Sequence, residues 1–166
     1  MAYVTPGTVA AGDVATAAAW NVLVGNDVAF SPLATAWVSY TPTIAQGAST
    51  NISKTVTTAR YLRVGTLLFV NMYLQITGAG TANNAITVSL PSGITMSQNH
   101  FFILGNGQYN DASVQRYPCG PYYQTSTTIT MRRTDQAPVD DIGRDPNIAV
   151  ASGDEIFLSF ACEVSP

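Results

Sequence analysis

The stretch from Tyr61 to Thr77 constrains the fold most, because its side chains alternate with a period of two over the length of a strand. One face of the expected strand is wholly apolar and carries Leu68, Val70, Met72, Leu74 and Ile76. A strand that exposes its other face to water is plainly polar there. Here that face mixes both kinds of side chain: Leu67, Phe69, Asn71, Tyr73, Gln75 and Thr77.

The chain after residue 35 repeats this β pattern in shorter segments. Two segments alternate cleanly, with inward positions at Ile86, Val88, Leu90, Ile156, Leu158, Phe160, Cys162 and Val164. Gly65 divides an expected hairpin, and the Gly-, Pro- and Asn-rich stretch 106–123 is expected to form loops. About seven to nine short antiparallel strands predict an all-β domain over residues 35–166, an antiparallel β-sandwich of jelly-roll type.

Residues 1–34 differ and are expected to form an N-terminal arm with one short helix. Thr16 can cap that helix. A helix of about 14 residues is marginal alone, so it needs a surface to pack against. Its own domain, symmetry mates and another protein are all open as that surface. The stripe that would make the contact comprises Trp20, Leu23, Val24 and Val28.

Composition excludes several partners. Only 10% of the residues are charged, and seven basic residues in a chain of net charge −3 form no cluster for nucleic acid. No apolar run is long enough to span a membrane, and the first residues do not read as a signal peptide. We therefore expect cytoplasmic assembly, which favours a buried thiol over a disulfide for Cys119 and Cys162.

Catalytic and metal-binding motifs are not evident, so we expect no enzymatic activity and no cofactor. His100 is the only histidine, and no nucleophile elbow, phosphate loop or zinc motif accompanies it. An acidic loop could hold Ca²⁺, or could be a solvated loop with Asx turns and an Asp–Arg pair. A glycosidase-like use of its carboxylates is a weaker alternative. The loop carries Asp135, Asp140, Asp141 and Asp145.

Four tyrosines form the most suggestive cluster for recognition. Tyrosines on loops give large contact areas at little entropic cost, so they suit a glycan or protein ligand. Packing over the end of the β-domain is an equal alternative. The cluster comprises Tyr109, Tyr117, Tyr122 and Tyr123.

Residues 13–92 resemble small structural proteins of tailed bacteriophage virions. The resemblance rests on a helix with Trp-Asn and Asn-Asp, a W-x-x-Y-T-P-T segment, an Arg-Tyr-x-Arg-x-Gly hairpin and a Ser-Leu-Pro segment. Ala59 stands where family members usually have Gly before the Arg-Tyr pair. The matching residues are Trp20-Asn21, Asn26-Asp27, Trp37, Tyr40-Thr41-Pro42-Thr43, Arg60-Tyr61, Arg63, Gly65 and Ser89-Leu90-Pro91.

The resemblance implies a homotrimeric β-domain on a virion, assembled in the host cytoplasm. A capsid decoration (cement) protein bound to the major capsid protein is the leading expectation. A tail-fibre or tail-tip adhesin, bound to tail proteins and to a host-surface glycan, is the alternative. In either case we expect Phe69 and Tyr73 to meet a neighbouring subunit, with Asn71 and Gln75 hydrogen-bonding across the contact.

Overall fold

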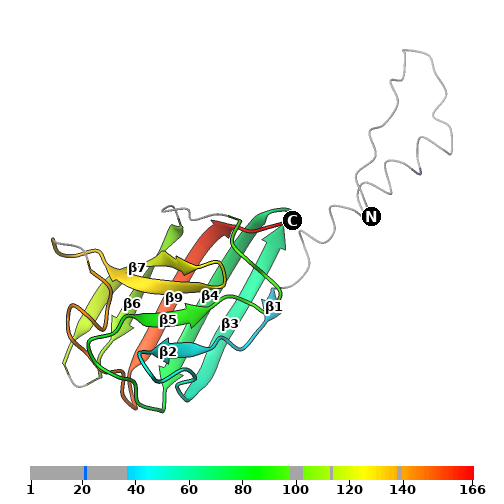
Figure 1. Ribbon diagram of the computed structural model, residues 1–166. Coiled ribbons are helices and arrows are strands. Elements are labelled where there is room, and N and C mark those ends of the chain that lie inside the picture. Colours follow the sequence, from blue (N-terminus) through cyan, green and yellow to red (C-terminus); the bar gives the residue numbers. More distant parts are fainter. Residues whose placement is uncertain (1–20, 22–36, 98–102, 113, 138–139) are drawn as a thin grey trace. The chain divides into compact units, whose positions relative to one another are not determined.

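The computed structural model describes Asn21 and residues 37–97, 103–112, 114–137 and 140–166 (Figure 1). The chain divides between Ala36 and Trp37 into two units, and every described strand belongs to the second. The expected helical stripe of Trp20, Leu23, Val24 and Val28 lies outside the described residues, as does His100. In the described part of the chain, no helix has the length and apolar character to cross a membrane.

Within the described residues, nine strands form one sheet in which every neighbouring pair is antiparallel. The prediction of an antiparallel all-β domain is confirmed. Their order in the sheet is β1-β3-β4-β9-β6-β7-β8-β5-β2. The strands are β1 Val38–Ser39, β2 Ile44–Gln46, β3 Lys54–Val64, β4 Leu67–Ile76, β5 Ile86–Ser89, β6 Leu104–Asn110, β7 Arg116–Thr125, β8 Thr128–Arg133 and β9 Glu155–Glu163.

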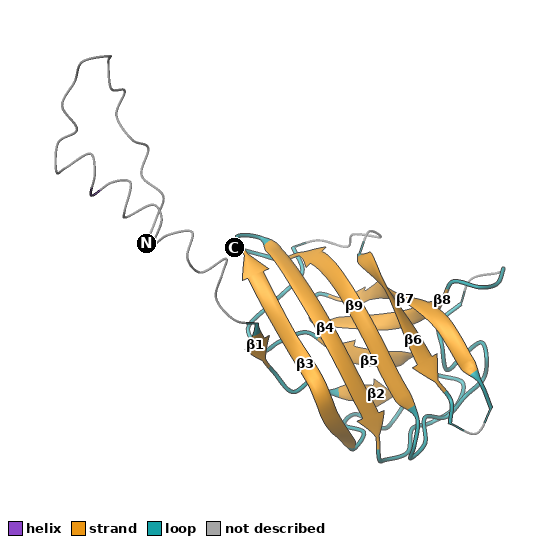
Figure 2. Cartoon of the chain, turned by 180° about the vertical axis from the view of Figure 1, so that it is seen from behind, coloured by secondary structure: helices purple, strands orange, loops and turns teal. Residues whose placement is uncertain are grey.

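The sheet curls into a half-barrel around its core (Figure 2). The long strands β3, β4, β9 and β6 form one wall, and in the view of Figure 2 the strands β7, β8, β5 and β2 cross behind it. Glycines in β6 bring it close to β9: a side chain at Gly107 would clash with Leu158, and one at Gly105 with Phe160. This close approach lies at the strand where one wall passes into the other.

Inside the half-barrel, the predicted alternation is confirmed. The even-numbered residues of β4 from Leu68 to Ile76 are all buried, as are the inward positions predicted in β5 and β9. Gly65, with a φ of 60°, lies in the β3–β4 hairpin turn, as predicted. Such a φ favours glycine, because a side chain is strained there.

Residues 106–123 depart from the prediction, because most of this stretch forms β6 and β7 rather than loops. Pro118 and Pro121 lie inside β7 and take part in its register, opposite Gln108 and Met131 respectively. Glycine and proline usually interrupt strands, which is why the sequence indicated loops here. The half-barrel therefore includes two strands, β6 and β7, that the composition of this segment does not indicate.

Buried polar side chains of the domain form hydrogen bonds that link the loops to the sheet. Gln46 is 1% exposed; its Nε2 donates to the carbonyls of Asn84 (3.0 Å) and Ile148 (2.7 Å), and its Oε1 accepts from the Val150 amide (3.0 Å). Asp154 accepts from the Tyr109 hydroxyl and from two backbone amides. Removing either side chain would leave buried partners unsatisfied.

Candidate binding surface

The outer face of β3, β4, β9 and β6 carries the side chains that point away from the core. The strand registers align these side chains in rows across the wall. One row is Leu62, Phe69, Ala161 and Leu104; the next is Arg60, Asn71, Ser159 and Asn106; the third is Thr58, Tyr73, Phe157 and Gln108. The face therefore changes from apolar to polar and aromatic along the strands.

In the third row, two aromatic rings stack within the chain. The rings of Tyr73 and Phe157 lie 4.4 Å apart between centroids at an interplanar angle of 12°. The Tyr73 hydroxyl donates to Oε1 of Glu155 (2.6 Å), whose Oε2 accepts from Nδ2 of Asn110 (2.8 Å). These hydrogen bonds lower the pKa of Glu155 and raise that of Tyr73. Tyr73 is thus fixed by its own chain.

A groove of about 380 Å³ lies over the middle of this face. The small, exposed Ser159 of β9 lies in the row between Asn71 of β4 and Asn106 of β6. The residues that line the groove are Asn71, Met72, Tyr73, Asn106, Gly107, Gln108, Phe157, Leu158 and Ser159. None of these residues is charged, so the groove suits a neutral ligand.

An exposed apolar cluster, which we call the apolar end, lies on the same outer face, where β3 ends and β4 begins. Leu67, Phe69 and Val64 are 42%, 36% and 37% exposed, and Leu62 pairs with Phe69 across the strands. Trp37 adds a fifth side chain, with the Arg60 guanidinium 5.0 Å from its ring centroid. Contiguous exposed apolar groups mark contact surfaces more often than single ones do.

The four interface residues expected on β4 therefore have different surroundings. Phe69 belongs to the apolar end, Asn71 and Tyr73 line the groove, and Gln75 is exposed beyond Tyr73. Sequence reasoning placed all four on one face, as the structure has them, but missed Phe157, Ser159, Asn106 and Gln108, which β9 and β6 bring beside them. Their outward alternation in β9 could have indicated Phe157 and Ser159.

The four predicted recognition tyrosines do not form a surface cluster. Tyr109 and Tyr117 are 0% and 4% exposed, so neither ring is accessible to a ligand in solution. The Tyr109 hydroxyl is bonded to Asp154, and burial raises its pKa. Tyr122 lies under the Arg132 guanidinium, 3.5 Å from its ring centroid, and Tyr123 is packed against the core.

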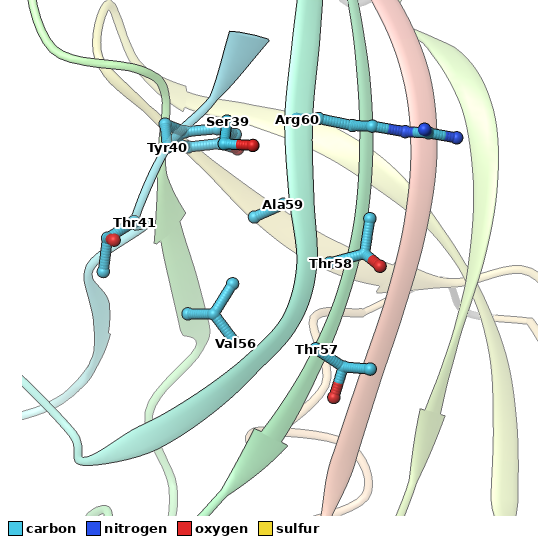
Figure 3. Close-up of a pocket in the computed structure, with 8 residues that line it drawn as sticks. All are labelled: Ser39, Tyr40, Thr41, Val56, Thr57, Thr58, Ala59 and Arg60. Carbon is cyan, nitrogen blue, oxygen red and sulfur yellow. The ribbon is translucent and has the colours of Figure 1, made fainter. Parts of the chain in front are cut away.

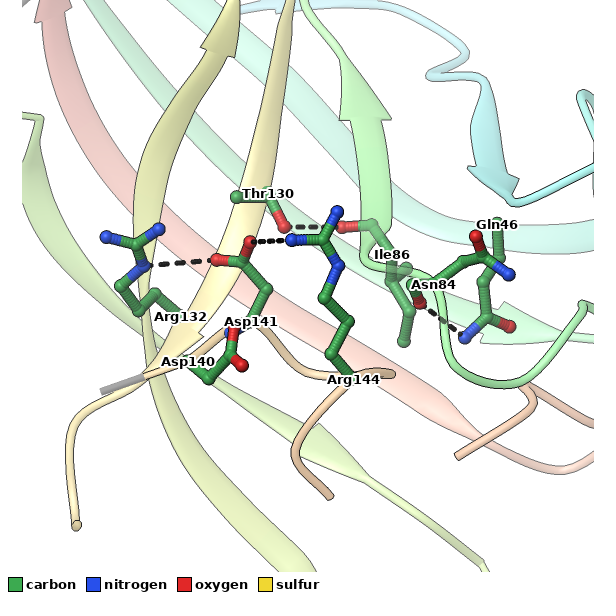
Figure 4. A network of polar contacts seen from close by, with 8 residues as sticks. All are labelled: Gln46, Asn84, Ile86, Thr130, Arg132, Asp140, Asp141 and Arg144. Atoms are coloured by element: carbon green, nitrogen blue, oxygen red, sulfur yellow. Dashed lines mark hydrogen bonds and ion pairs between the residues drawn. The ribbon is translucent and has the colours of Figure 1, made fainter. Parts of the chain in front are cut away.

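The acidic loop is held by arginines and amides (Figure 4). Asp141, nearly buried, lies between Arg132 (Nε–Oδ1, 3.1 Å) and Arg144 (3.9 Å). Arg133 pairs with Asp135 and lowers the pKa of that carboxyl. Asp145 accepts from Gln136, and Asp140 from the Asp141 amide. Among the described residues, no group of three potential metal ligands comes together.

The two cysteines are free thiols in the core. Burial raises the pKa of Cys119 to about 12 and that of Cys162 to about 11. A thiol with a raised pKa is a poor nucleophile at neutral pH. Both side chains therefore serve as small apolar groups in the half-barrel.

A second hollow of about 490 Å³ follows the edge of β3 (Figure 3). Tyr40 and Thr41 lie on one side of it, and Val56 to Arg60 on the other. Among the described residues, β3 pairs with β1 only at Arg60 and Tyr61, so Lys54 to Thr58 form an edge. Lys54 and the register shift around Thr57 are devices that discourage edge-to-edge pairing between sheets.

Comparison of the chain with protein-family models, curated proteins and solved structures finds no match.

Proposed function

We propose that this protein is a non-enzymatic structural component of a bacteriophage virion, a homotrimeric capsid decoration protein. Its copies contact one another through the apolar end. The observation that carries the proposal is the contiguous exposure of Trp37, Val64, Leu67 and Phe69 beside Leu62 on the outer face of the sheet. In a cyclic trimer, each such cluster meets a neighbouring subunit.

The pattern of charge and edges supports a face-to-face contact rather than strand addition. The five side chains of the apolar end carry no charge, as the core of a protein interface requires. The open edge of β3 carries Lys54 and a register shift, which oppose pairing through that edge. The outer face is therefore the more suitable surface for self-association.

We also propose a more specific class for this all-β fold. The two walls of the half-barrel face each other across one core, as the two sheets of a β-sandwich do. This likeness supports the proposal that the domain belongs to the sandwich and jelly-roll group. A compact domain of this kind favours a cap on a capsid over a fibre.

A tail-fibre or tail-tip adhesin is the second candidate. The groove over Ser159 favours it, because a neutral hollow beside two aromatic rings suits a glycan. The two candidates differ in position on the particle. Gold-labelled antibodies on purified virions are expected to mark the head; labelling confined to the tail would favour the adhesin, and unlabelled virions would contradict both.

Attachment is tested with a chain that lacks residues 1–34. We expect this variant to remain folded and oligomeric, because the strands and the apolar end lie after residue 36. We also expect it to lose attachment to particles, because the arm is proposed to bind the capsid. Normal decoration by the shortened chain would contradict the anchoring role.

A further inference from the structure

We propose that the groove over Ser159 binds a neutral glycan. This inference goes beyond the proposed assembly role and does not depend on it. The site comprises Ser159 with Asn71 and Asn106 beside it, Gln108, and the stacked pair Tyr73–Phe157. The volume of about 380 Å³ lies in the range of ligand pockets.

The shape of the groove follows from which strand carries small side chains. β9 presents Ser159 and Ala161 to the outside, whereas β4 and β6 present larger residues in the same rows. The floor therefore lies along β9, and the walls rise from Asn71 on one side and Asn106 on the other. Phe157 precedes Ser159 on this face of β9 and limits the groove at one end.

The polar groups of the groove are uncommitted. The side chains of Asn71, Asn106, Gln108 and Ser159 form no hydrogen bond to another described residue. By contrast, Asn110 in the next row is bonded to Glu155. Amide and hydroxyl groups both donate and accept, which matches the hydroxyls of a sugar. The aromatic pair offers an apolar surface to the C–H groups of a sugar ring.

A glycan fits this groove better than a protein segment does. An apolar contact from a second copy would bury the amides of Asn71 and Asn106 without partners, at a cost in free energy. An extended peptide would find no free backbone groups, because β4, β9 and β6 pair with one another here. The uncharged lining disfavours acidic polysaccharides, which need cationic partners.

The test is an NMR titration of the isotope-labelled full-length protein with three neutral oligosaccharides: maltohexaose, cellohexaose and chitohexaose. We expect at least one to shift the side-chain amide signals of Asn71, Asn106 and Gln108 in a saturable way, with a millimolar Kd. The affinity should be insensitive to salt, because no charged group takes part.

Two variants locate the binding. Ser159→Gln fills the floor with a neutral side chain at an exposed position, so the fold should be kept and the affinity should fall at least tenfold. Phe157→Ala should also weaken binding. The matched control is Gln75→Ala, which removes an amide from the same face of β4 outside the groove and should leave the affinity unchanged.

Three outcomes overturn the inference. They are the absence of groove shifts with all three oligosaccharides, binding that survives Ser159→Gln, and dissociation of the oligomer by Ser159→Gln, which would place a second copy in the groove. The mass of each sample separates this test from that of the assembly role. A trimer without glycan shifts contradicts only the glycan site, whereas a monomer with them contradicts only self-association.

Discussion

Phe69 and Tyr73 lie on the same face of the same strand, yet only Tyr73 has both a stacking partner and a hydrogen-bonding partner within the chain. Tyr73 stacks on Phe157 and donates its hydroxyl to Glu155. Phe69 faces Leu62 and the small Ala161 across the strands and remains 36% exposed. The sequence pattern is the same at both positions, so the difference comes from the neighbouring strands.

This difference separates two reasons why the outer face of the sheet carries apolar side chains. Around Tyr73, the apolar surface contributes to the stability of the monomer. Around Phe69, part of the apolar surface stays exposed, and that exposure costs solubility unless another molecule covers it. The assembly proposal therefore depends on the apolar end, and Tyr73 is not needed for it.

The largest expected effect is on oligomeric state. Phe69→Asp places a charge in the centre of the apolar end and should convert the proposed trimer into a folded monomer, because a desolvated, unpaired charge opposes association. Light scattering measures the mass, and circular dichroism checks the fold. Gln75→Asp, on the same face but outside the apolar end, should leave the proposed trimer intact.

Two results would break this distinction between the ends of β4. If Gln75→Asp dissociates the protein and Phe69→Asp does not, the contact lies nearer the groove. A protein that remains trimeric with both substitutions associates through another surface.

A smaller effect is expected on stability. In a Phe69→Asp background, where unfolding should involve a single chain, Tyr73→Ala should lower the free energy of unfolding by about 1–3 kcal/mol. A double-mutant cycle with Phe157→Ala should give a coupling energy of about 0.5–1.5 kcal/mol. Urea unfolding measures both. A coupling near zero would mean that the stacked pair does not stabilise the monomer.

The smallest expected effect concerns the loss of stability at acid pH. The pKa of Glu155 is lowered from its ordinary value of 4.5, because it accepts hydrogen bonds from Tyr73 and Asn110. Its contribution to stability is therefore present above pH 4.5 and is lost as the pH falls through the folded-state pKa. Tyr73→Phe should reduce this acid-induced loss. An unchanged pH profile of urea midpoints would contradict the role of the hydroxyl.

The buried faces of β4, β5 and β9 could be predicted from sequence because the alternation in these strands is strict. Burial of Leu74 or Ile156 follows from counting in twos. The partner of Tyr73 could not be predicted, since Phe157 is far along the chain and the register of β4 against β9 is set by packing. Local pattern determines a face, whereas pairing determines what lies beside it.

The tyrosines of residues 106–123 show a different cause of error. Gly107, Pro118 and Pro121 indicated loops, and they concealed two strands that bury Tyr109 and Tyr117. One signal was available: Tyr117, Cys119 and Pro121 alternate with Arg116, Pro118 and Gly120, and the first set is buried. The candidate groove lies instead where β4, β9 and β6 pair with one another.

The central claim, that copies of this chain cover one another's apolar end, is tested most directly by the mass of the full-length protein in solution. Sedimentation equilibrium at micromolar concentration should give three times the chain mass of 17.5 kDa. A mass of 17.5 kDa at every concentration up to the limit of solubility would contradict the claim, because the apolar end would then be stable in water without a partner.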